Sequence, residues 1–215
     1  MPDLTTYLAF LGAVLVYQLS GVGPDMMLVI SRGVGQGWRQ ALAAATGCVS
    51  AGVVQIPLLA MGLATLITSS PPLYNLLQIV GAIYLIAIGL KFLLAHRQDE
   101  NHASAFANTS GVAAVFWQGM ICNLTNPTTL AFMLAVLPQF VHPWAGPPAL
   151  QFVILGATMK MMGMVVLGAL ALTSGAVGGW LSRRSNFVVW QERLAGAIMV
   201  AIGIRLLLAV TSGRR

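Results

Sequence analysis

Two charged side chains stand inside apolar stretches, and they are the first candidates for chemistry. Asp25 is the only acidic residue within such a stretch. A charge at the centre of a membrane helix costs about 2.5–3.5 kcal/mol on insertion scales, so it is by default a functional candidate. We expect Asp25 to bind a substrate ammonium group or a transported proton. The alternative role is structural, because an acid in the first turn of a helix complements the helix dipole.

Lys160 is the second charged candidate and lies in an apolar stretch that begins near Ala149. It is about 11 residues, or roughly 17 Å, into that stretch, which is near mid-depth and too far for easy contact with surface water. We expect its side chain to face other helices and to contact a carboxylate or a carbonyl. Asp25 is the available carboxylate, so a structural ion pair and a role in binding both remain open.

Two proline motifs interrupt apolar stretches: Gly23-Pro24-Asp25, and the run from Asn123 to Thr128. Proline is favoured at the first position of a helix and Asn at its cap, so each motif predicts the start of a half-helix. The free N–H groups at such a start attract anions. We therefore expect Asn126, Pro127 and Thr128 to surround a substrate carboxylate. The alternative is a simple kink whose freed groups are satisfied by neighbouring helices.

Other polar residues carry weaker signals. Gln55 is a further candidate for the site, although most polar residues in membrane helices simply hydrogen-bond between helices. Cys48 and Cys122 are interpreted as small core residues. The histidines lack metal-ligand spacing, and motifs for ATP binding or hydrolysis do not occur. We expect no metal, no cofactor and no enzymatic reaction.

The elements that position these residues follow from composition. Hydrophobic residues make up 58% of the 215 and charged residues only 7%, whereas a soluble domain is about 25% charged. Residues 40–90 and 101–159 contain no Asp, Glu, Lys or Arg, and each run is long enough for two helices of roughly 20 residues. The runs do not alternate as barrel strands do. The sequence predicts an all-α integral membrane protein, so the net charge of +6 reflects topology and not nucleic-acid binding.

Six membrane-spanning helices are expected, the first and fourth broken at proline. They cover residues 4–30, 41–67, 73–94, 112–141, 149–172 and 194–210. Cytoplasmic loops carry an excess of Lys and Arg. The basic residues in the connections 1–2, 3–4 and 5–6 are Arg32, Arg39, Lys91, Arg97, Arg183, Arg184 and Arg193. This asymmetry places those connections inside and both termini in the periplasm.

An internal repeat sharpens the architecture. The segment from Gly81 to Ala95 recurs, with one deletion, between Gly196 and Ala209. We expect a three-helix unit at residues 1–94, a hydrophilic cytoplasmic loop at 95–111 and a second three-helix unit at 112–215. Three spans repeated once must cross the membrane in opposite directions, which is the inverted-repeat plan of secondary transporters. Chance similarity between two apolar helices is the alternative.

The whole chain resembles the LysE/RhtB family of amino-acid exporters. The segments that carry the resemblance are Gly23-Pro24-Asp25, Arg32 to Gly47, Asn123 to Pro127, Leu137-Pro138-Gln139-Phe140 and Arg193 to Ala197. The resemblance implies six helices, a bacterial inner membrane and export of amino acids or their derivatives, driven by an ion gradient. It places the family's broken-helix motifs on Pro24, Asp25, Asn126 and Pro127. The sequence departs from the family at Thr128, where a basic residue is common, and at Lys160, which leaves the substrate open.

The expected function is therefore export of an amino acid or a derivative across the bacterial inner membrane, coupled to the proton gradient. Asp25 would face the ammonium group or the proton, and Asn126 with the following amides would face the carboxylate. The expected partners are this solute and membrane lipid, and association of several copies is compatible with the sequence. Two alternatives are a transmembrane thiol–disulfide electron carrier using Cys48 and Cys122, and a membrane assembly protein that does not transport.

Overall fold

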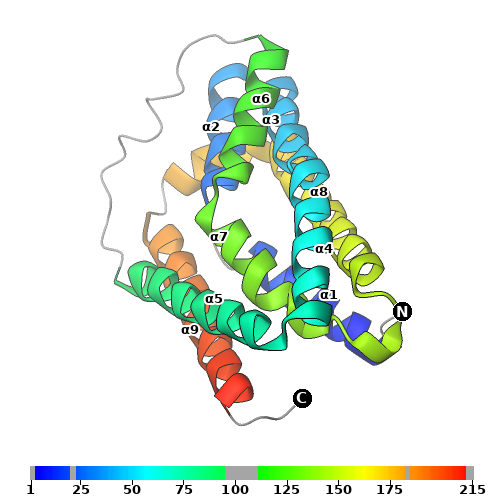
Figure 1. The fold of residues 1–215 in the computed structure, drawn as a ribbon. Helices are drawn as coiled ribbons and strands as arrows, with labels where there is room; N and C mark the ends of the chain where they lie inside the picture. The colour runs from blue at the N-terminus through cyan, green and yellow to red at the C-terminus, as the bar shows by residue number, and fades with distance from the viewer. Residues whose placement is uncertain (1–2, 20–22, 95–110, 183–184, 212–215) are drawn as a thin grey trace.

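The computed structural model describes residues 3–19, 23–94, 111–182 and 185–211. These residues form a bundle of helices and contain no strand (Figure 1). The prediction of an all-α membrane protein is confirmed. Most of the expected hydrophilic loop, residues 95–110, lies outside the described residues.

The first half of the chain contains one sharply bent pair of helices and three further helices. The bend between the first two is 52°, and the second of them begins at Pro24, as predicted. A turn at Ala51 separates the next two, which together form one candidate span over Trp38–Thr65. In chain order the helices are α1 (Leu4–Leu19), α2 (Pro24–Gln36), α3 (Trp38–Ser50), α4 (Gly52–Ser69) and α5 (Pro71–Leu93).

The second half contains the other predicted break, where a new helix begins at Pro127 and the chain bends by 46°. After this short helix the chain continues as a π-helical turn and a 3₁₀ turn, whose residues are mostly buried. Burial in protein is the condition under which irregular backbone is tolerated at membrane depth. The elements are α6 (Val112–Leu124), α7 (Pro127–Ala131), η3 (Phe132–Val136), η4 (Leu137–Phe140), η5 (Pro143–Ala145), α8 (Pro148–Ser182) and α9 (Ser185–Thr211).

Candidate membrane spans can be counted among the described residues. Three helices are long and apolar enough by themselves, and the count rises to 5 if each bent pair is one span. The region of the sixth expected span is α9, which contains the shorter apolar segment Gly196–Leu208. The number six and the inverted repeat stay predictions.

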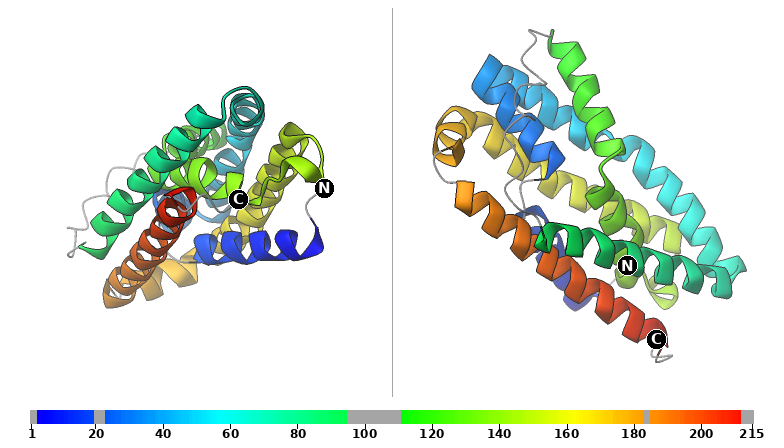
Figure 2. Two further views of the ribbon diagram at one scale, coloured as in Figure 1. Left: turned by 60° about the horizontal axis from the view of Figure 1, so that its bottom comes forward. Right: turned by 90° about the vertical axis from the view of Figure 1, so that its left-hand side faces the viewer.

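The two copies of the predicted repeat lie against each other. Helices α5 and α9 pack side by side and run in opposite directions (Figures 1 and 2). A Cβ atom added to Gly89 would lie 2.7 Å from the Gly196 carbonyl oxygen, and one added to Gly203 would lie 2.9 Å from the Ala82 carbonyl oxygen. Small residues thus let the two backbones touch, as is common between membrane helices.

A second close pair, α3 and α6, brings the site residues together. A Cβ atom on Gly47 would lie 2.0 Å from the Phe116 carbonyl oxygen, and one on Gly119 would lie 2.2 Å from that of Ala44. Helix α2 packs against α3, α6 and α8, and α8 also packs against α3. This arrangement directs side chains from four helices toward one interior point.

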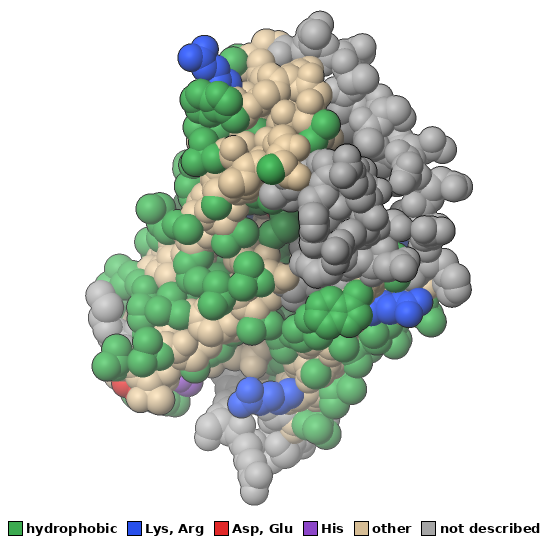
Figure 3. Space-filling view, turned by 180° about the vertical axis from the view of Figure 1, so that it is seen from behind, with side chains coloured by type: hydrophobic (Ala, Val, Ile, Leu, Met, Phe, Trp, Pro, Cys, Tyr) green, Lys and Arg blue, Asp and Glu red, His purple; other side chains and the backbone are tan. Residues whose placement is uncertain are grey.

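The outward faces of the helices are apolar. Figure 3 shows hydrophobic side chains spread over much of the described surface on one side of the molecule, with Lys and Arg in only a few places. Val53, near the middle of the candidate span Trp38–Thr65, is 76% exposed, and Val165, in the middle of α8, is 72% exposed. Large apolar side chains exposed along most of a bundle are compatible with lipid as the surrounding solvent.

Candidate functional site

Asp25 lies in the first turn of α2 and points into the protein. Gly23 caps this helix with extended backbone, and Pro24 supplies the first helical position. Pro24 itself is exposed and Gly23 is half-buried, and both set where the helix starts. The Asp25 carboxylate accepts a hydrogen bond of 2.6 Å through Oδ2 from the Asn123 side chain.

Lys160 extends from α8 into the same region and is buried, as the sequence predicts. Its ammonium nitrogen donates a hydrogen bond of 2.7 Å to Asn123 Oδ1. Gly52 makes room for its aliphatic stem, because a Cβ atom there would lie 2.8 Å from Lys160 Cγ. The glycine at the start of α4 is thus a positioning residue that sequence reasoning missed.

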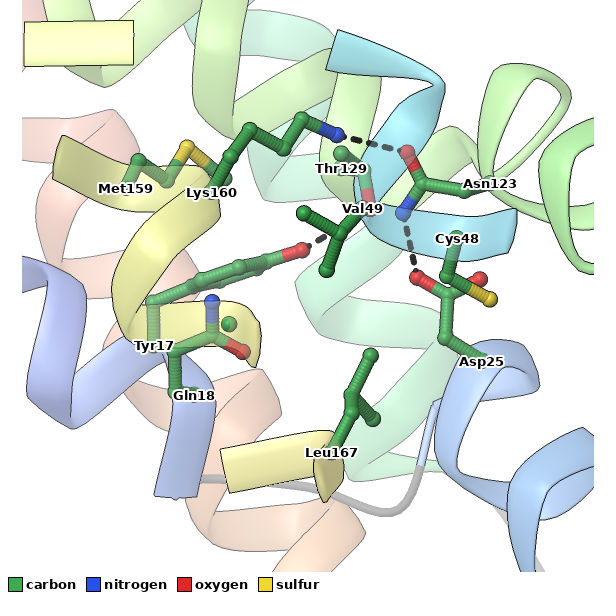
Figure 4. A pocket seen from close by; sticks show the side chains of 11 residues that line it. Tyr17, Gln18, Asp25, Cys48, Val49, Asn123, Thr129, Met159, Lys160 and Leu167 are labelled. Carbon is green, nitrogen blue, oxygen red and sulfur yellow. Dashed lines mark hydrogen bonds between the residues drawn. The ribbon is translucent and has the colours of Figure 1, made fainter. Parts of the chain in front are cut away.

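Asn123 connects the two charges. Figure 4 shows its side chain, near the end of α6, between Lys160 on one side and Asp25 on the other. Among the described residues no direct ion pair joins Asp25 to Lys160, and the Asn123 amide stands between them. An amide suits this place because its nitrogen donates to a carboxylate while its oxygen accepts from an ammonium. The three residues form a hydrogen-bonded chain in which the neutral Asn123 side chain joins the negative Asp25 to the positive Lys160.

The break between α6 and α7 is stabilised by the side chains around it. Asn126 Oδ1 accepts hydrogen bonds from the amides of Thr128 at 3.0 Å and Thr129 at 3.4 Å. Asn126 is therefore the helix cap that its motif predicts. Gln55 is buried and donates from Nε2 to the Asn123 carbonyl oxygen at 3.2 Å. Pro127 is exposed and, like Pro24, starts its helix without entering the cluster.

A small cavity adjoins the cluster. Its volume is about 30 Å³, enough for about two water molecules. Its polar side includes Tyr17, whose hydroxyl shares a hydrogen bond of 3.0 Å with Thr129 Oγ1. The lining residues are Tyr17, Gln18, Asp25, Cys48, Val49, Asn123, Thr129, Met159, Lys160, Gly163 and Leu167.

The structure brings some predicted site residues together and leaves others at the margin. Asp25, Asn123 and Lys160 line the cavity, while Asn126, Thr128 and Gln55 support the helix break beside it. The apolar lining residues, among them Val49 and Leu167, were missed because they resemble any other core residue in the sequence. Gly163 was also missed, although a glycine in a membrane helix often marks close packing; a Cβ atom there would lie 3.0 Å from Gln18 Nε2.

The two cysteines are free thiols. Cys48 is buried and lines the cavity, and Cys122 is partly buried beside Asp25. Their place in this cluster is that of small packing residues.

Two interrupted helices that meet at a buried, charged cavity are the arrangement typical of secondary transporters, in which broken helices supply polar groups at membrane depth. The chain matches the family model of the LysE type translocator over residues 7–210 and belongs to that family. It is a transporter and not an enzyme.

The chain is also similar along its length to curated bacterial proteins. It is 29% identical to a leucine efflux protein of Klebsiella pneumoniae over 204 residues, which cover 93% of each chain. It is 28% identical to a leucine efflux protein of Salmonella typhimurium over 94% of this chain and 92% of the relative. An uncharacterised membrane protein of Pseudomonas aeruginosa is 31% identical over 98% of this chain and 97% of the relative. No solved structure matches this chain.

Proposed function

We propose that the protein exports an α-amino acid with an apolar side chain across the bacterial inner membrane, with leucine as the first candidate. The observation that carries this proposal is the pairing of Asp25 and Lys160 through Asn123 at the cavity. One carboxylate and one ammonium are what a zwitterionic solute needs, because its two ends have the opposite charges. The relatives that bear the name leucine efflux protein support the same substrate.

The lining of the cavity supports an apolar side chain on the substrate. Val49, Met159 and Leu167 contribute apolar surface beside the charged cluster. Among the described lining residues the charges are Asp25 and Lys160, and both are engaged if the substrate's ammonium and carboxylate bind there. A lysine or glutamate side chain would then bring a further charge without a partner, which is unfavourable in a buried site.

The proton gradient is the proposed driving force. Asp25 binds either the substrate ammonium or a proton, so release of the substrate to the periplasm is followed by protonation from that side. The protonated carboxyl returns inward and gives its proton to the cytoplasm. This cycle exchanges one proton for one substrate at a single carboxylate, and it moves substrate outward when the periplasm is the more acidic side.

Purified protein in lipid vesicles tests the proposal. Vesicles are loaded with radiolabelled leucine and diluted into buffer of equal or lower pH. We expect efflux above that of protein-free vesicles, faster with acid outside, and reduced to the equal-pH rate by a protonophore. Parallel vesicles loaded with lysine or glutamate should retain their label. Equal efflux of all three solutes contradicts the selectivity, and efflux insensitive to the pH difference contradicts the coupling.

A further inference from the structure

The Asn123 side chain binds its two neighbours with the same polarity as an amino acid would. Its Nδ2 donates to the Asp25 carboxylate at 2.6 Å, where a substrate ammonium would donate. Its Oδ1 accepts from the Lys160 ammonium at 2.7 Å, where a substrate carboxylate would accept. The primary amide thus reproduces, within one neutral group, the donor and the acceptor of an amino-acid head group.

The cavity beside this amide, as the described residues form it, is too small for a substrate. The cavity of about 30 Å³ accommodates about two water molecules, and an amino acid is several times larger. Asp25 Oδ1 is buried and has no hydrogen-bond partner among the described residues, so the Asn123 amide satisfies only one of the two carboxylate oxygens. An ammonium has three N–H donors and satisfies both oxygens, whereas the amide reaches one of them.

We infer that Asn123 is a placeholder for the substrate head group, occupying the charged site when the transporter is empty and leaving it when an α-amino acid binds. The inference rests on the proposed function. The placeholder would act in the step in which the substrate-free protein turns its site from the periplasm back to the cytoplasm. With the amide in place, the protonated Asp25 carboxyl and the Lys160 ammonium both keep a hydrogen-bonded partner on the return step, so the Lys160 charge is not left buried and unpaired.

The same geometry restricts the substrate class. The amide nitrogen and oxygen are two bonds apart, and the ammonium nitrogen and carboxylate oxygen of an α-amino acid are three bonds apart. A β-amino acid adds a further bond, and an N-acetylated amino acid or an amino-acid amide lacks one of the charges. We expect α-amino acids with both groups free to compete best for the site.

Asn123→Ala separates this role from simple positioning. Two assays are run on reconstituted protein: net efflux of labelled leucine into leucine-free buffer, and exchange of labelled for external unlabelled leucine. Net efflux requires the empty protein to return, whereas exchange returns it loaded. We expect net efflux to fall roughly tenfold or more, because the returning empty site now holds the buried Lys160 charge without its Asn123 partner, and exchange to stay within about threefold of wild type. Asn123→Gln, which keeps the amide, should restore part of the net efflux.

The controls make each outcome decisive. Thr125→Ala is the matched control, because within the described ranges this exposed hydroxyl near the same helix end bonds only to the carbonyl oxygens of Ile121 and Cys122 in α6. It should leave both assays unchanged. If Asn123→Ala lowers exchange as much as net efflux, or changes neither, the placeholder role is wrong. If that variant does not accumulate, Asn123→Ser, which cannot span both partners, is measured against the same expectations. Absence of leucine transport by the wild-type protein would instead contradict the proposed function.

Discussion

Gln55 on α4 holds the backbone of Asn123 on α6 by a hydrogen bond of 3.2 Å from Nε2 to the carbonyl oxygen. In an unbroken helix this carbonyl would accept from the residue four positions later, which is Pro127 and has no N–H. The backbone N–H of Asn126 donates a second hydrogen bond of 3.2 Å to the same Asn123 carbonyl oxygen. A side chain 68 residues away in sequence therefore satisfies an acceptor that the proline releases, and it does so at the residue that links the two buried charges.

Replacing Gln55 by Leu should destabilise the protein by about 0.5–1.5 kcal/mol, because the Asn123 carbonyl loses one of its two donors and keeps the backbone N–H of Asn126. Thermal unfolding in detergent measures the change. The control is Gln139→Leu, since Gln139 also donates to a backbone carbonyl, that of Ala135, but within its own chain segment. Equal losses of stability in the two variants would show that the Gln55–Asn123 hydrogen bond contributes no more than one made within a single chain segment.

Asp25→Asn keeps the shape of the side chain and removes its charge. Leucine efflux should fall by roughly tenfold or more, since a buried acid in a membrane helix that binds an ammonium or a proton cannot be replaced by an amide. The amount of protein in the membrane should be unchanged. Asp3→Asn is the control, because Asp3 is exposed and its carboxylate accepts from the Thr6 amide outside the site. Normal efflux by the Asp25 variant would reduce the residue to a helix cap.

Lys160 and Asp25 should be energetically coupled although Asn123 separates them. Lys160→Met alone leaves the carboxylate with one neutral partner and should lower thermal stability. In the double variant with Asp25→Asn, part of this loss should be recovered, with a coupling free energy of about 0.5–3 kcal/mol. The measurement is a double-mutant cycle on unfolding in detergent. Strict additivity would mean that Lys160 depends on Asn123 and not on the carboxylate beyond it.

Gly119 should tolerate no side chain. A Cβ atom there would lie 2.2 Å from the Ala44 carbonyl oxygen, so Gly119→Ala must push α6 away from α3. We expect a loss of about 1–3 kcal/mol from overpacking and a lower rate of efflux, because the shift moves Asn123. Gly62→Ala is the control: nothing lies within 4 Å of a Cβ atom at that position. This variant should be neutral or slightly stabilising, since Ala favours helix.

The predicted topology places the connection after Ser70 and the one after His142 in the periplasm. A reporter enzyme that is active only outside the cytoplasm should work when fused after either residue. Fusions after Asn101 or Arg184, in the expected cytoplasmic connections outside the described residues, should be inactive. The opposite pattern would reverse the orientation, which depends on the distribution of Lys and Arg among the loops.

The sequence by itself determined the class of the protein and the location of both helix breaks. Composition decides whether a chain can face water, and Pro24 and Pro127 act locally by removing an N–H group and fixing the backbone of the next turn. The burial of Lys160 also followed from its depth in an apolar stretch. These properties depend on residue type and on neighbours along the chain, so they can be read without knowing which helices touch.

Only the tertiary structure decided how the site is connected. Asn123 was grouped with a proline motif, but its place between Asp25 and Lys160 depends on how α2, α6 and α8 are rotated and on the close approach of α3 and α6. The role of Gly52 likewise appears only when the Lys160 stem crosses it. Such contacts join residues far apart in sequence, and in nearly uniformly apolar helices no periodic pattern marks which face turns inward.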